Sequence, residues 1–532
     1  MVQESLLFVI SLLFSVLVLV MLGQKLRIAY PIFLVIGGLL ISFIPGIPHY
    51  SISPDLVFLI FLPPLLYEAA WYTSWRNFWK WRRPIGMLGF GLVIFTSLIV
   101  AFVTERLIPR FTLSIGFLLG GIISPPDAVA ATSVLRYFKI PKSVKTILEG
   151  ESLVNDASSL TVVRFAMAAV ISGSFVIEKA ATAFFMVTLM GIVIGLGIAH
   201  LIYFVHRKLP TTPSIDTALD LLSPYIMYLA AEHFHYSGIL AVVSGGLFLS
   251  FRSHEIMNHR ARLQASSVWS TITFVLNGLI FILIGLQLPL IVNGLKYYTL
   301  QEAIRYGLIV SALIIVIRMA WIFPATYLPR WLSRRVRENE KRPLLRNVFL
   351  TGWAGMRGVV TLAAALAIPM SLADGSLFPE RELVIFISFM VILVTLVLQG
   401  LTLPIVIYFL KIRPADEGKP ADMQAQEIHL RLLKLSLNQL DRKYGQLLQQ
   451  NGLVKNLKKR FENEIGITSE NIETLQADPD ELAEMKDYRK VLLEIGEAQR
   501  NELFELRKDN AYDDEVLRRE ESRVDLEQTK VG

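Results

Sequence analysis

The sequence predicts an all-α protein that crosses a membrane many times and ends in a helical soluble tail. Hydrophobic residues make up 53% of the 532 residues, charged residues only 18%, and the mean hydropathy is +0.51. Most of this chain therefore requires lipid rather than water as its solvent. The charge changes sign late in the chain: residues 1–413 hold 33 Lys and Arg against 19 Asp and Glu, whereas residues 414–532 hold 19 against 26. We expect a membrane domain over 1–413 and a soluble domain over 414–532.

Composition also excludes several kinds of function. The chain contains no cysteine, so it has no disulfide framework, no thiolate metal site and no cysteine nucleophile. The net charge of +7 does not indicate a nucleic-acid partner, because the cytoplasmic loops of membrane proteins are basic for topological reasons. We expect no nucleic acid and no cofactor, and membrane lipid as the surrounding partner.

Thirteen apolar stretches are candidates for membrane spans, since each approaches the roughly 20 residues that cross a bilayer. The first, Ser5 to Leu22, has no basic residues before it and no small-residue cleavage site, so we interpret it as a retained span rather than a signal peptide. The others lie at 28–44, 54–72, 84–103, 112–135, 146–172, 180–204, 216–234, 237–251, 268–292, 303–323, 347–372 and 383–410. The eighth and ninth are the weakest, because 237–251 is short and a thin loop separates the two.

The charges in the loops predict the orientation of these spans. With the N-terminus outside, the loops that would face the cytoplasm hold 24 Lys and Arg, and the opposite loops hold 6. Cytoplasmic loops of membrane proteins carry such an excess of positive charge. We therefore expect a multi-pass protein of the cell membrane (inner or plasma membrane) with a cytoplasmic tail.

The tail shows helical periodicity from about Ala421 onward and predicts an amphipathic helical hairpin. One broad apolar face is expected to hold Leu433, Leu437, Leu440, Tyr444, Leu447 and Leu448. Dimer contact, regulation and an inert appendage all remain open as roles for this tail.

Ionisable side chains inside the spans are expensive to bury and therefore indicate function. They are Glu68, Asp127, Glu149, Glu151, Asp156, Arg164, Arg318 and Arg357. No histidine lies deep in a span, so a proton that crosses the membrane would be carried mainly by carboxylates. We expect Arg164 and Arg318 to form ion pairs or to extend toward the membrane surface.

The sixth span carries two acidic residues that cannot do the same job. Ser152 and Asp156 are four residues apart and share one helix face, with Glu149 one turn below. Glu151 lies about 140° around the helix from Asp156 and shares its own face with Asn155, four residues later. At 1.5 Å per residue Asp156 lies about 15 Å deep, close to the middle of the bilayer core.

Two spans are interrupted at the same depth. Pro125 and Pro126 precede Asp127 in the fifth span, and glycines surround Arg357 in the twelfth. Glu68 in the third span falls near this level as well, so these charges must be paired with one another or line a wet cavity. Unwound backbone at matching places seven spans apart predicts crossed discontinuous helices in two inverted repeats, spans 1–6 and 8–13, with span 7 as the linker.

Four motifs carry a family resemblance over most of residues 1–410. The strings FLPPLLYEAA, IISPPDAVAAT, EGESLVNDASSL and GWAGMRGVVTLAAAL resemble the NhaP/NHE family of sodium/proton antiporters, in the right order and spacing. The resemblance implies a homodimer and an elevator-like motion of a core domain against a dimerisation domain. The span 5 motif here reads PPD where the family commonly has TDP, so Pro126 offers no hydroxyl.

The same resemblance implies roles for particular residues. Asp156 would be the central cation- and proton-binding carboxylate, with Ser152, Glu68 and the backbone carbonyl of Pro126 as further ligands of Na+. Asn155 stands beside Asp156 where the electrogenic relatives have a second aspartate. Glu151 and Arg357 would form a structural ion pair.

Two other acidic residues have open roles. Asp127 would bond the end of the span 12 helix or act as a cation ligand. Glu149 would attract cations at the cytoplasmic mouth or be simply solvated.

The function expected from these residues is exchange of a monovalent cation for a proton, with one Na+ for one H+ and no net charge moved. The alternatives are a potassium/proton antiporter, a cation channel that uses the same carboxylates, and an intramembrane enzyme. The enzyme is the least favoured, because the sequence has no Ser/His pair in the membrane, no HExxH motif and no convincing aspartate dyad.

Overall fold

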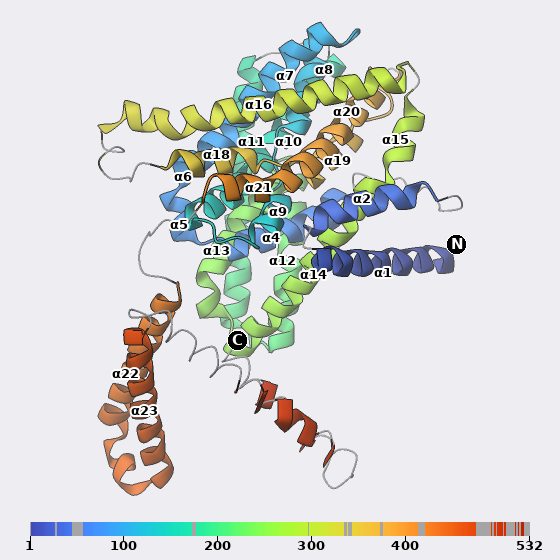
Figure 1. Ribbon diagram of the computed structural model, residues 1–532. Coiled ribbons are helices and arrows are strands. Elements are labelled where there is room, and N and C mark those ends of the chain that lie inside the picture. The colour runs from blue at the N-terminus through green and yellow to red at the C-terminus, as the bar shows by residue number, and fades with distance from the viewer. Residues whose placement is uncertain are drawn as a thin grey trace. The chain divides into compact units, whose positions relative to one another are not determined.

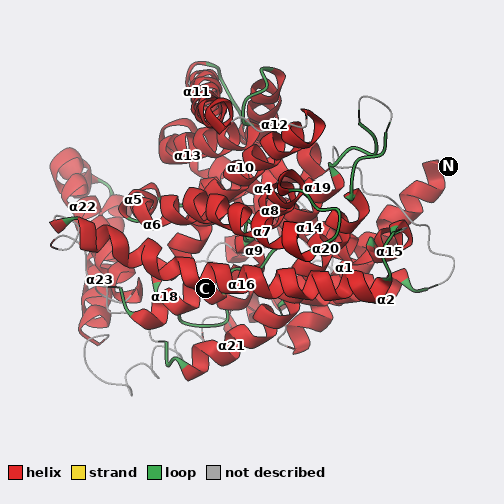
Figure 2. Ribbon diagram, turned by 90° about the horizontal axis from the view of Figure 1, so that it is seen from above, coloured by secondary structure: helices red, strands yellow, loops and turns green. Residues whose placement is uncertain are grey.

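The computed structural model describes residues 2–26, 29–44, 57–172, 177–295, 297–334, 338, 343–372, 376–412 and 421–474, with scattered residues from 491 onward. In this part of the chain the regular structure is helical throughout, as Figure 2 shows in red. The chain divides into two compact units, Met1–Pro414 and Ala415–Gly532. The start of the predicted second and third spans, at 28 and 54–56, and most of the segment that follows 474 lie outside the described residues.

Each of the thirteen predicted spans corresponds to one helix or to an interrupted helix (Figure 1). The first seven spans are formed by α1 (Val2–Leu26), α2 (Tyr30–Ser42), the π-helix η1 (Val57–Phe61) with α4 (Leu62–Tyr72), α6 (Arg82–Gly86) with the π-helix η2 (Met87–Leu92) and α7 (Val93–Leu107), α8 (Leu113–Ile123) with α9 (Ala128–Leu135), α10 (Lys142–Ser172) and α11 (Ile177–Lys208). A short helix, α5 (Trp75–Lys80), lies between the third and fourth spans.

The remaining six spans follow the same pattern. They are formed by α12 (Pro213–His233), α13 (Gly238–Ile256), α14 (His259–Leu286), α16 (Leu300–Leu332), α18 (Leu345–Trp353) with α19 (Val359–Leu366), and α20 (Arg381–Val394) with the π-helix η3 (Thr395–Gln399) and α21 (Gly400–Phe409). A short helix, α15 (Leu288–Gly294), follows α14.

Within the described residues, nine helical segments are long and apolar enough to cross a membrane, and α2 and η1–α4 are shorter apolar helices. The other two predicted spans do not meet this criterion. The eighth is α12, which carries Asp216, Asp220 and Glu232, and the twelfth is divided into α18 and α19. The helix at the predicted span 237–251 is longer than expected, since α13 extends to Ile256.

The two interrupted helices occupy the fifth and twelfth positions, which is the relation that the predicted inverted repeats require. In the fifth, Pro125 and Pro126 follow the end of α8, and neither can donate a backbone hydrogen bond to continue the helix. In the twelfth, the chain leaves helical geometry between α18 and α19, and Gly358 comes directly before α19. A Cβ atom on Gly358 would lie 1.9 Å from Asp127 Oδ2, so only glycine allows the two breaks to approach this closely.

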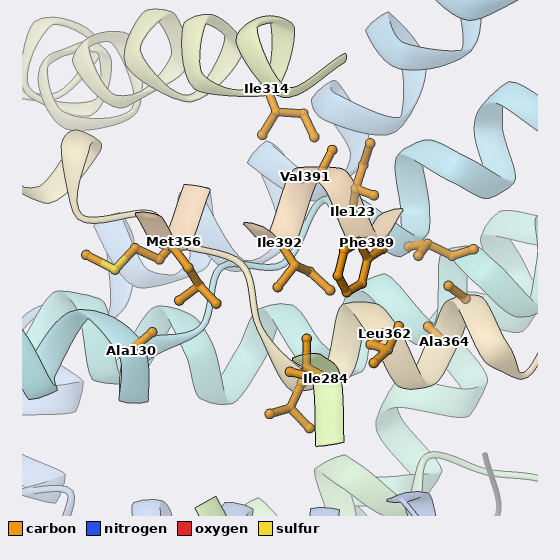
Figure 3. Close-up of a cluster of buried hydrophobic side chains, with 14 of the residues drawn as sticks. Ile123, Ala130, Ile284, Ile314, Met356, Leu362, Ala364, Phe389, Val391 and Ile392 are labelled. Atoms are coloured by element: carbon orange, nitrogen blue, oxygen red, sulfur yellow. The ribbon is translucent and has the colours of Figure 1, made fainter. Parts of the chain in front are cut away.

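Apolar side chains from many elements surround these breaks (Figure 3). Ile123 at the end of α8, Met356 in the second break and Leu362 of α19 are all buried in one cluster. Phe389 and Ile392 of α20 belong to the same cluster. This packing excludes water from the breaks on that side, so their free backbone groups must find partners within the protein.

The membrane unit consists of two groups of helices that pack mainly within themselves. We call the first the α4 group; it contains α1, α2, η1–α4 and α11–α14. The second, the α10 group, contains α6–α10, α16 and α18–α21. In Figure 1, α16 runs alongside α18 and α20 of its own group.

The tail contains the predicted helical hairpin, formed by α22 (Ala421–Gln450) and α23 (Gly452–Thr474). Lys458 donates a hydrogen bond of 2.8 Å across the hairpin to Asp441, which raises the pKa of Lys458. A kink interrupts the predicted apolar face of α22. Tyr444 has non-helical backbone angles (φ −122°, ψ 22°), and this kink leaves Tyr444 and Leu447 exposed while Leu433 is buried.

Candidate functional site

A cavity of about 350 Å³ lies where the two helix groups meet. Residues of α4 and α14 line it from the α4 group, and residues of α9, α10 and α19 line it from the α10 group. Six of the residues predicted from the sequence line this one cavity: Glu68, Pro126, Asp127, Glu149, Ser152 and Asp156. The cavity extends to Lys145, whose side chain is 61% exposed, and to Thr73 at the end of α4.

Asp156 is the most deeply placed carboxylate of this cavity and is only 7% exposed. Among the described residues none forms a hydrogen bond or an ion pair with its side chain. Burying a carboxylate without a partner is expensive, and in a membrane span such a group marks an ion or proton pathway. The carboxylate is therefore free to bind a proton or a cation from the cavity.

Glu68 faces the cavity from α4, and so from the other helix group. Its half-buried side chain also has no hydrogen-bond or ion-pair partner within the described part of the chain. Glu149 differs, because Lys145 lies 3.6 Å from its carboxylate and both side chains are partly exposed. Within the described residues, Asp156 and Glu68 thus have no partner, whereas Glu149 near the exposed end of the cavity pairs with Lys145.

The neutral ligands that the sequence suggested are partly engaged with each other. Ser152 Oγ accepts a long hydrogen bond of 3.4 Å from the backbone N–H of Ala128 at the start of α9. The carbonyl of Pro126 accepts a hydrogen bond of 3.2 Å from Asn155 Nδ2. Asn155 is fully buried, does not line the cavity, and its Oδ1 has no partner in the described residues. Asn155 therefore holds the first break against α10.

Asp127 lies at the beginnings of both half-helices. Its Oδ1 accepts a hydrogen bond of 2.8 Å from Val129 N–H in α9, and its Oδ2 lies against Gly358 at the start of α19. Its own N–H donates to the carbonyl of Met356 at 2.7 Å, which ties the two breaks together. Helix N-termini carry a partial positive charge, so one carboxylate here stabilises two of them.

Arg357 lies at the opposite kind of helix end. Its Nε donates to the carbonyl of Ile123 at 3.1 Å, and its Nη2 donates to the carbonyl of Ser124 at 3.3 Å. These carbonyls end α8 and carry the negative end of its dipole. The side chain is fully buried and also donates to the carbonyl of Gly355.

The predicted ion pair between Glu151 and Arg357 is wrong. Glu151 instead pairs with Arg318 of α16, through Nη1 to Oε1 at 2.5 Å and Nη2 to Oε2 at 2.9 Å. Arg318 also donates to the carbonyls of Thr351 and Gly352, which end α18. Each arginine thus stabilises the end of one half-helix. Arg318 can do this and also pair with Glu151 of α10, because α16 packs against α18.

Sequence analysis missed several polar residues that the fold brings together. Asn277 of α14 and Thr361 of α19 line the same cavity as Asp156. Asp220 of α12 is 2% exposed and accepts hydrogen bonds from two aromatic side chains of neighbouring helices. The signal was present, since Asp220 follows Asp216 by one helical turn inside an apolar stretch.

Among the described residues, two further salt bridges join α12 to neighbouring helices. Arg164 on α10 pairs with Glu232 on α12, with Nη2 at 2.6 Å from Oε2 and 2.8 Å from Oε1. This is one of the two environments expected for Arg164. His206 at the end of α11 and Asp216 are both buried and lie 2.9 Å apart.

The described part of the membrane unit is helical, and two of its helices are interrupted and contact each other at the breaks. The buried Asp156 carboxylate in the adjoining cavity has no partner among the described residues. This combination is typical of secondary transporters with discontinuous helices. The family described as "Sodium/hydrogen exchanger, transmembrane" matches residues 10–408, and the chain belongs to this family. The match confirms the resemblance seen in the four motifs.

Individual relatives agree with this assignment. The chain is 36% identical over 377 residues to the "Sodium, potassium, lithium and rubidium/H(+) antiporter" of Bacillus pumilus, an alignment that covers 69% of this chain and 56% of that protein. It is 31% identical over 529 residues to an uncharacterised Na+/H+ exchanger of Mycobacterium tuberculosis, covering 98% of this chain and 95% of that one. The chain thus spans just over half the length of the Bacillus protein.

A solved structure confirms the fold class. The sodium proton antiporter MjNhaP1 from Methanocaldococcus jannaschii superposes with a TM-score of 0.61 at 18% sequence identity, covering 77% of this chain and 99% of that chain. At this identity the likeness concerns the fold alone.

Proposed function

We propose that this protein exchanges a monovalent cation, Na+ in the first instance, for a proton across the cell membrane. The observation that carries the proposal is the buried Asp156 carboxylate, which faces a cavity at the helix crossing and has no protein partner among the described residues. Such a group can hold either a proton or a cation, but not both, so binding of one releases the other. This competition is the chemistry that antiport requires.

Oxygen atoms for a cation are available around Asp156. Glu68 adds a second carboxylate, and Ser152 adds a hydroxyl one helical turn before Asp156. The Pro126 carbonyl already accepts one hydrogen bond from Asn155 and retains its second lone pair. Na+ bound at Asp156, Glu68 and Ser152 is cargo rather than a resident metal.

Alternating access by an elevator-like motion is supported by the position of these groups. Asp156 and Ser152 belong to the α10 group and Glu68 to the α4 group. Movement of one group past the other would carry Asp156 and Ser152 across the membrane and separate them from Glu68. Lys145 lies at the mouth, and Arg164 lies about 28 Å further along α10 at 1.5 Å per residue. There the Arg164–Glu232 pair joins the two groups on the side away from the mouth.

We propose that the cavity mouth lies on the cytoplasmic side, with the N-terminus outside and the tail inside, because the basic loops favour this orientation. We further propose that the protein is a homodimer, as the family resemblance implies. Its physiological role would be the control of pH and sodium.

Potassium/proton exchange is the second candidate, because the relative from Bacillus pumilus is named as an antiporter of sodium, potassium, lithium and rubidium. All the proposed ligands are oxygen atoms, so selection among these cations depends on the distances between the ligands. A cation channel would use the same carboxylates but would not couple cation flow to protons.

Reconstituted protein separates these functions. Proteoliposomes with a pH dye inside and an imposed pH gradient would receive Na+, Li+, K+ or Rb+ outside. We expect Na+ to dissipate the gradient with wild-type protein and not with Asp156→Asn. A response to K+ of equal size would favour the broader antiporter, and cation uptake without proton movement would indicate a channel.

A further inference from the structure

A buried polar cluster packs against α4 outside the cavity. Tyr67 donates a hydrogen bond of 2.5 Å to Asp220 Oδ1 of α12, and Trp269 of α14 donates one of 2.6 Å to Asp220 Oδ2. The rings of Tyr67 and Trp269 also lie against each other, with centroids 5.3 Å apart. We call these three residues the Asp220 clasp, and none of them is more than 2% exposed.

The clasp is adjacent to the cation site in sequence as well as in space. Tyr67 immediately precedes Glu68, and consecutive residues of a helix point about 100° apart. Tyr67 therefore reaches toward α12 and α14 while Glu68 faces the cavity. Any rotation of α4 that moves one of these side chains must move the other.

The backbone of α4 needs such an anchor. Pro63 and Pro64 stand in its first turn and have no N–H to donate, and the preceding segment is the π-helix η1. Fewer backbone hydrogen bonds therefore fix the rotation of this segment. Glu68 itself has no partner in the described residues, so its position depends on the contacts that other side chains of α4 make with α12 and α14.

The clasp is a strong anchor because both oxygens of Asp220 accept hydrogen bonds from rigid aromatic side chains. Hydrogen bonds to a charged acceptor are roughly twice as strong as neutral ones, and burial strengthens them further. Asp216, one turn earlier on α12, pairs with His206 of α11 at 2.9 Å, which holds α12 in turn. The chain of contacts runs from α11 through α12 to α4.

We propose that Asp220 and Tyr67 are positioning residues for the cation site, which fix the rotation of α4 and thereby the place of Glu68 in the cavity. This rests on the proposed function, in which Glu68 is a cation ligand. Neither Asp220 nor Tyr67 touches the cation. Their effect is on cation affinity, whereas the transport step at saturating cation depends on Asp156.

The test is the Na+ dependence of exchange in proteoliposomes for Tyr67→Phe, which removes only the hydroxyl. We expect the apparent KM for Na+ to rise roughly fivefold, equivalent to about 1 kcal/mol, while the maximal rate stays within about a factor of two. Asp220→Asn, which keeps the side-chain shape but can no longer accept both hydrogen bonds, should produce the same split between KM and maximal rate.

Tyr225→Phe is the matched control. Tyr225 lies on α12 and its hydroxyl donates at 3.3 Å to the carbonyl of Ile60 in η1, so the same chemical change removes another hydrogen bond between these elements. Its apparent KM should stay at the wild-type value. An equal rise in KM for Tyr225→Phe and Tyr67→Phe would assign the effect to general loosening and overturn the inference.

A double-mutant comparison decides whether the clasp acts through Glu68. In the Glu68→Gln background, Tyr67→Phe should cause no further rise in KM, because the carboxylate that it positions is gone. A full additional rise would overturn the inference, as would an unchanged KM in Tyr67→Phe alone. Failure of the proposed function is distinct: wild-type protein would then exchange no cation for protons at all, or Glu68→Gln would leave the KM unchanged.

Discussion

Glu151 and Arg318 face each other as a doubly hydrogen-bonded ion pair, and neither side chain is more than 1% exposed. The pair joins α10, which carries Asp156, to α16. Through the carbonyls of Thr351 and Gly352, Arg318 also holds the end of α18. A buried bidentate pair with its remaining donors satisfied is a geometry that repays the cost of desolvation.

The first prediction is that breaking this pair lowers the stability of the protein, because the pair has a structural role and is not part of the cation site. Glu151→Gln or Arg318→Met alone should cost on the order of 3–5 kcal/mol, because the remaining charge is buried without a partner. Arg318→Met should be the worse of the two, since it also leaves the end of α18 unsatisfied. Thermal unfolding of the purified protein in detergent measures both.

The double variant Glu151→Leu with Arg318→Met should recover part of the loss, since no orphaned charge remains. Arg164→Gln provides the control, because its pair with Glu232 is half exposed and such pairs contribute little to stability. Single variants of Glu151 and Arg318 with the thermal stability of the parent protein would contradict the interpretation.

The sequence was sufficient to predict the helices and their order. Thirteen apolar stretches became thirteen helices or interrupted helices, because the length of a span is set by the bilayer and the breaks by Pro125, Pro126 and Gly358. The acidic residues that line the cavity were also found, because carboxylates in apolar spans are few. Both features are local, and a single chain displays them directly.

The pairing of residues between distant spans could not be predicted in this way. Arg318 and Arg357 both lie in the membrane near the level of Glu151, and the choice between them depends on the rotation and packing of helices 167 residues apart. The partners of Asp220 could likewise not be predicted, because Tyr67 and Trp269 come from helices far away in the sequence. Only the assembled α4 group shows that these side chains meet.

The second prediction concerns Asp156. The Asp156→Asn variant should fold and remain in the membrane but exchange no cation, because an amide neither releases a proton nor balances a bound cation. Its thermal stability should be equal to or above that of the parent, since it removes a buried carboxylate that has no partner in the described part of the chain. Retained exchange in proteoliposomes, measured with a pH dye, would remove Asp156 from the proposed site.

The third prediction separates Glu68 from Glu149. Glu68→Gln should raise the apparent KM for Na+ about tenfold, because it removes a direct ligand worth on the order of 1.4 kcal/mol. Glu149→Gln should have a smaller effect that fades at high ionic strength, since Glu149 is partly exposed and acts only by attracting cations. Rates measured over a range of Na+ concentrations at two ionic strengths test this. Equal and salt-independent effects would place both residues at the cation.

The fourth prediction concerns the Arg164–Glu232 pair. If the site opens to the side away from the mouth by movement between helix groups, this pair must break in that step. Arg164→Gln should therefore favour the state in which the site is open to the side away from the mouth. The chain has no native cysteine, so a single cysteine in place of Leu160, one turn beyond Asp156, reports exposure without background. Labelling of this cysteine by an impermeant maleimide should be faster with Arg164→Gln. An unchanged labelling rate would contradict the interpretation that the Arg164–Glu232 pair holds this side of the site closed.

The last prediction is electroneutral exchange, and it depends on Asn155. This residue is a neutral amide that donates to the Pro126 carbonyl, so Asp156 is the only carboxylate on α10 at this level that can alternate between proton and cation. The proton-loaded and cation-loaded sites then carry the same charge, and a full cycle moves none. Glu68 would spoil this balance if it released a second proton, so the prediction requires that Glu68 keeps the same charge in the proton-loaded and cation-loaded states. Competition for this site should make the apparent KM for Na+ rise as the pH falls. Recordings on solid-supported membranes should show no sustained current, and exchange in potential-clamped vesicles should not respond to voltage. A steady current would mean that more than one proton moves for each cation.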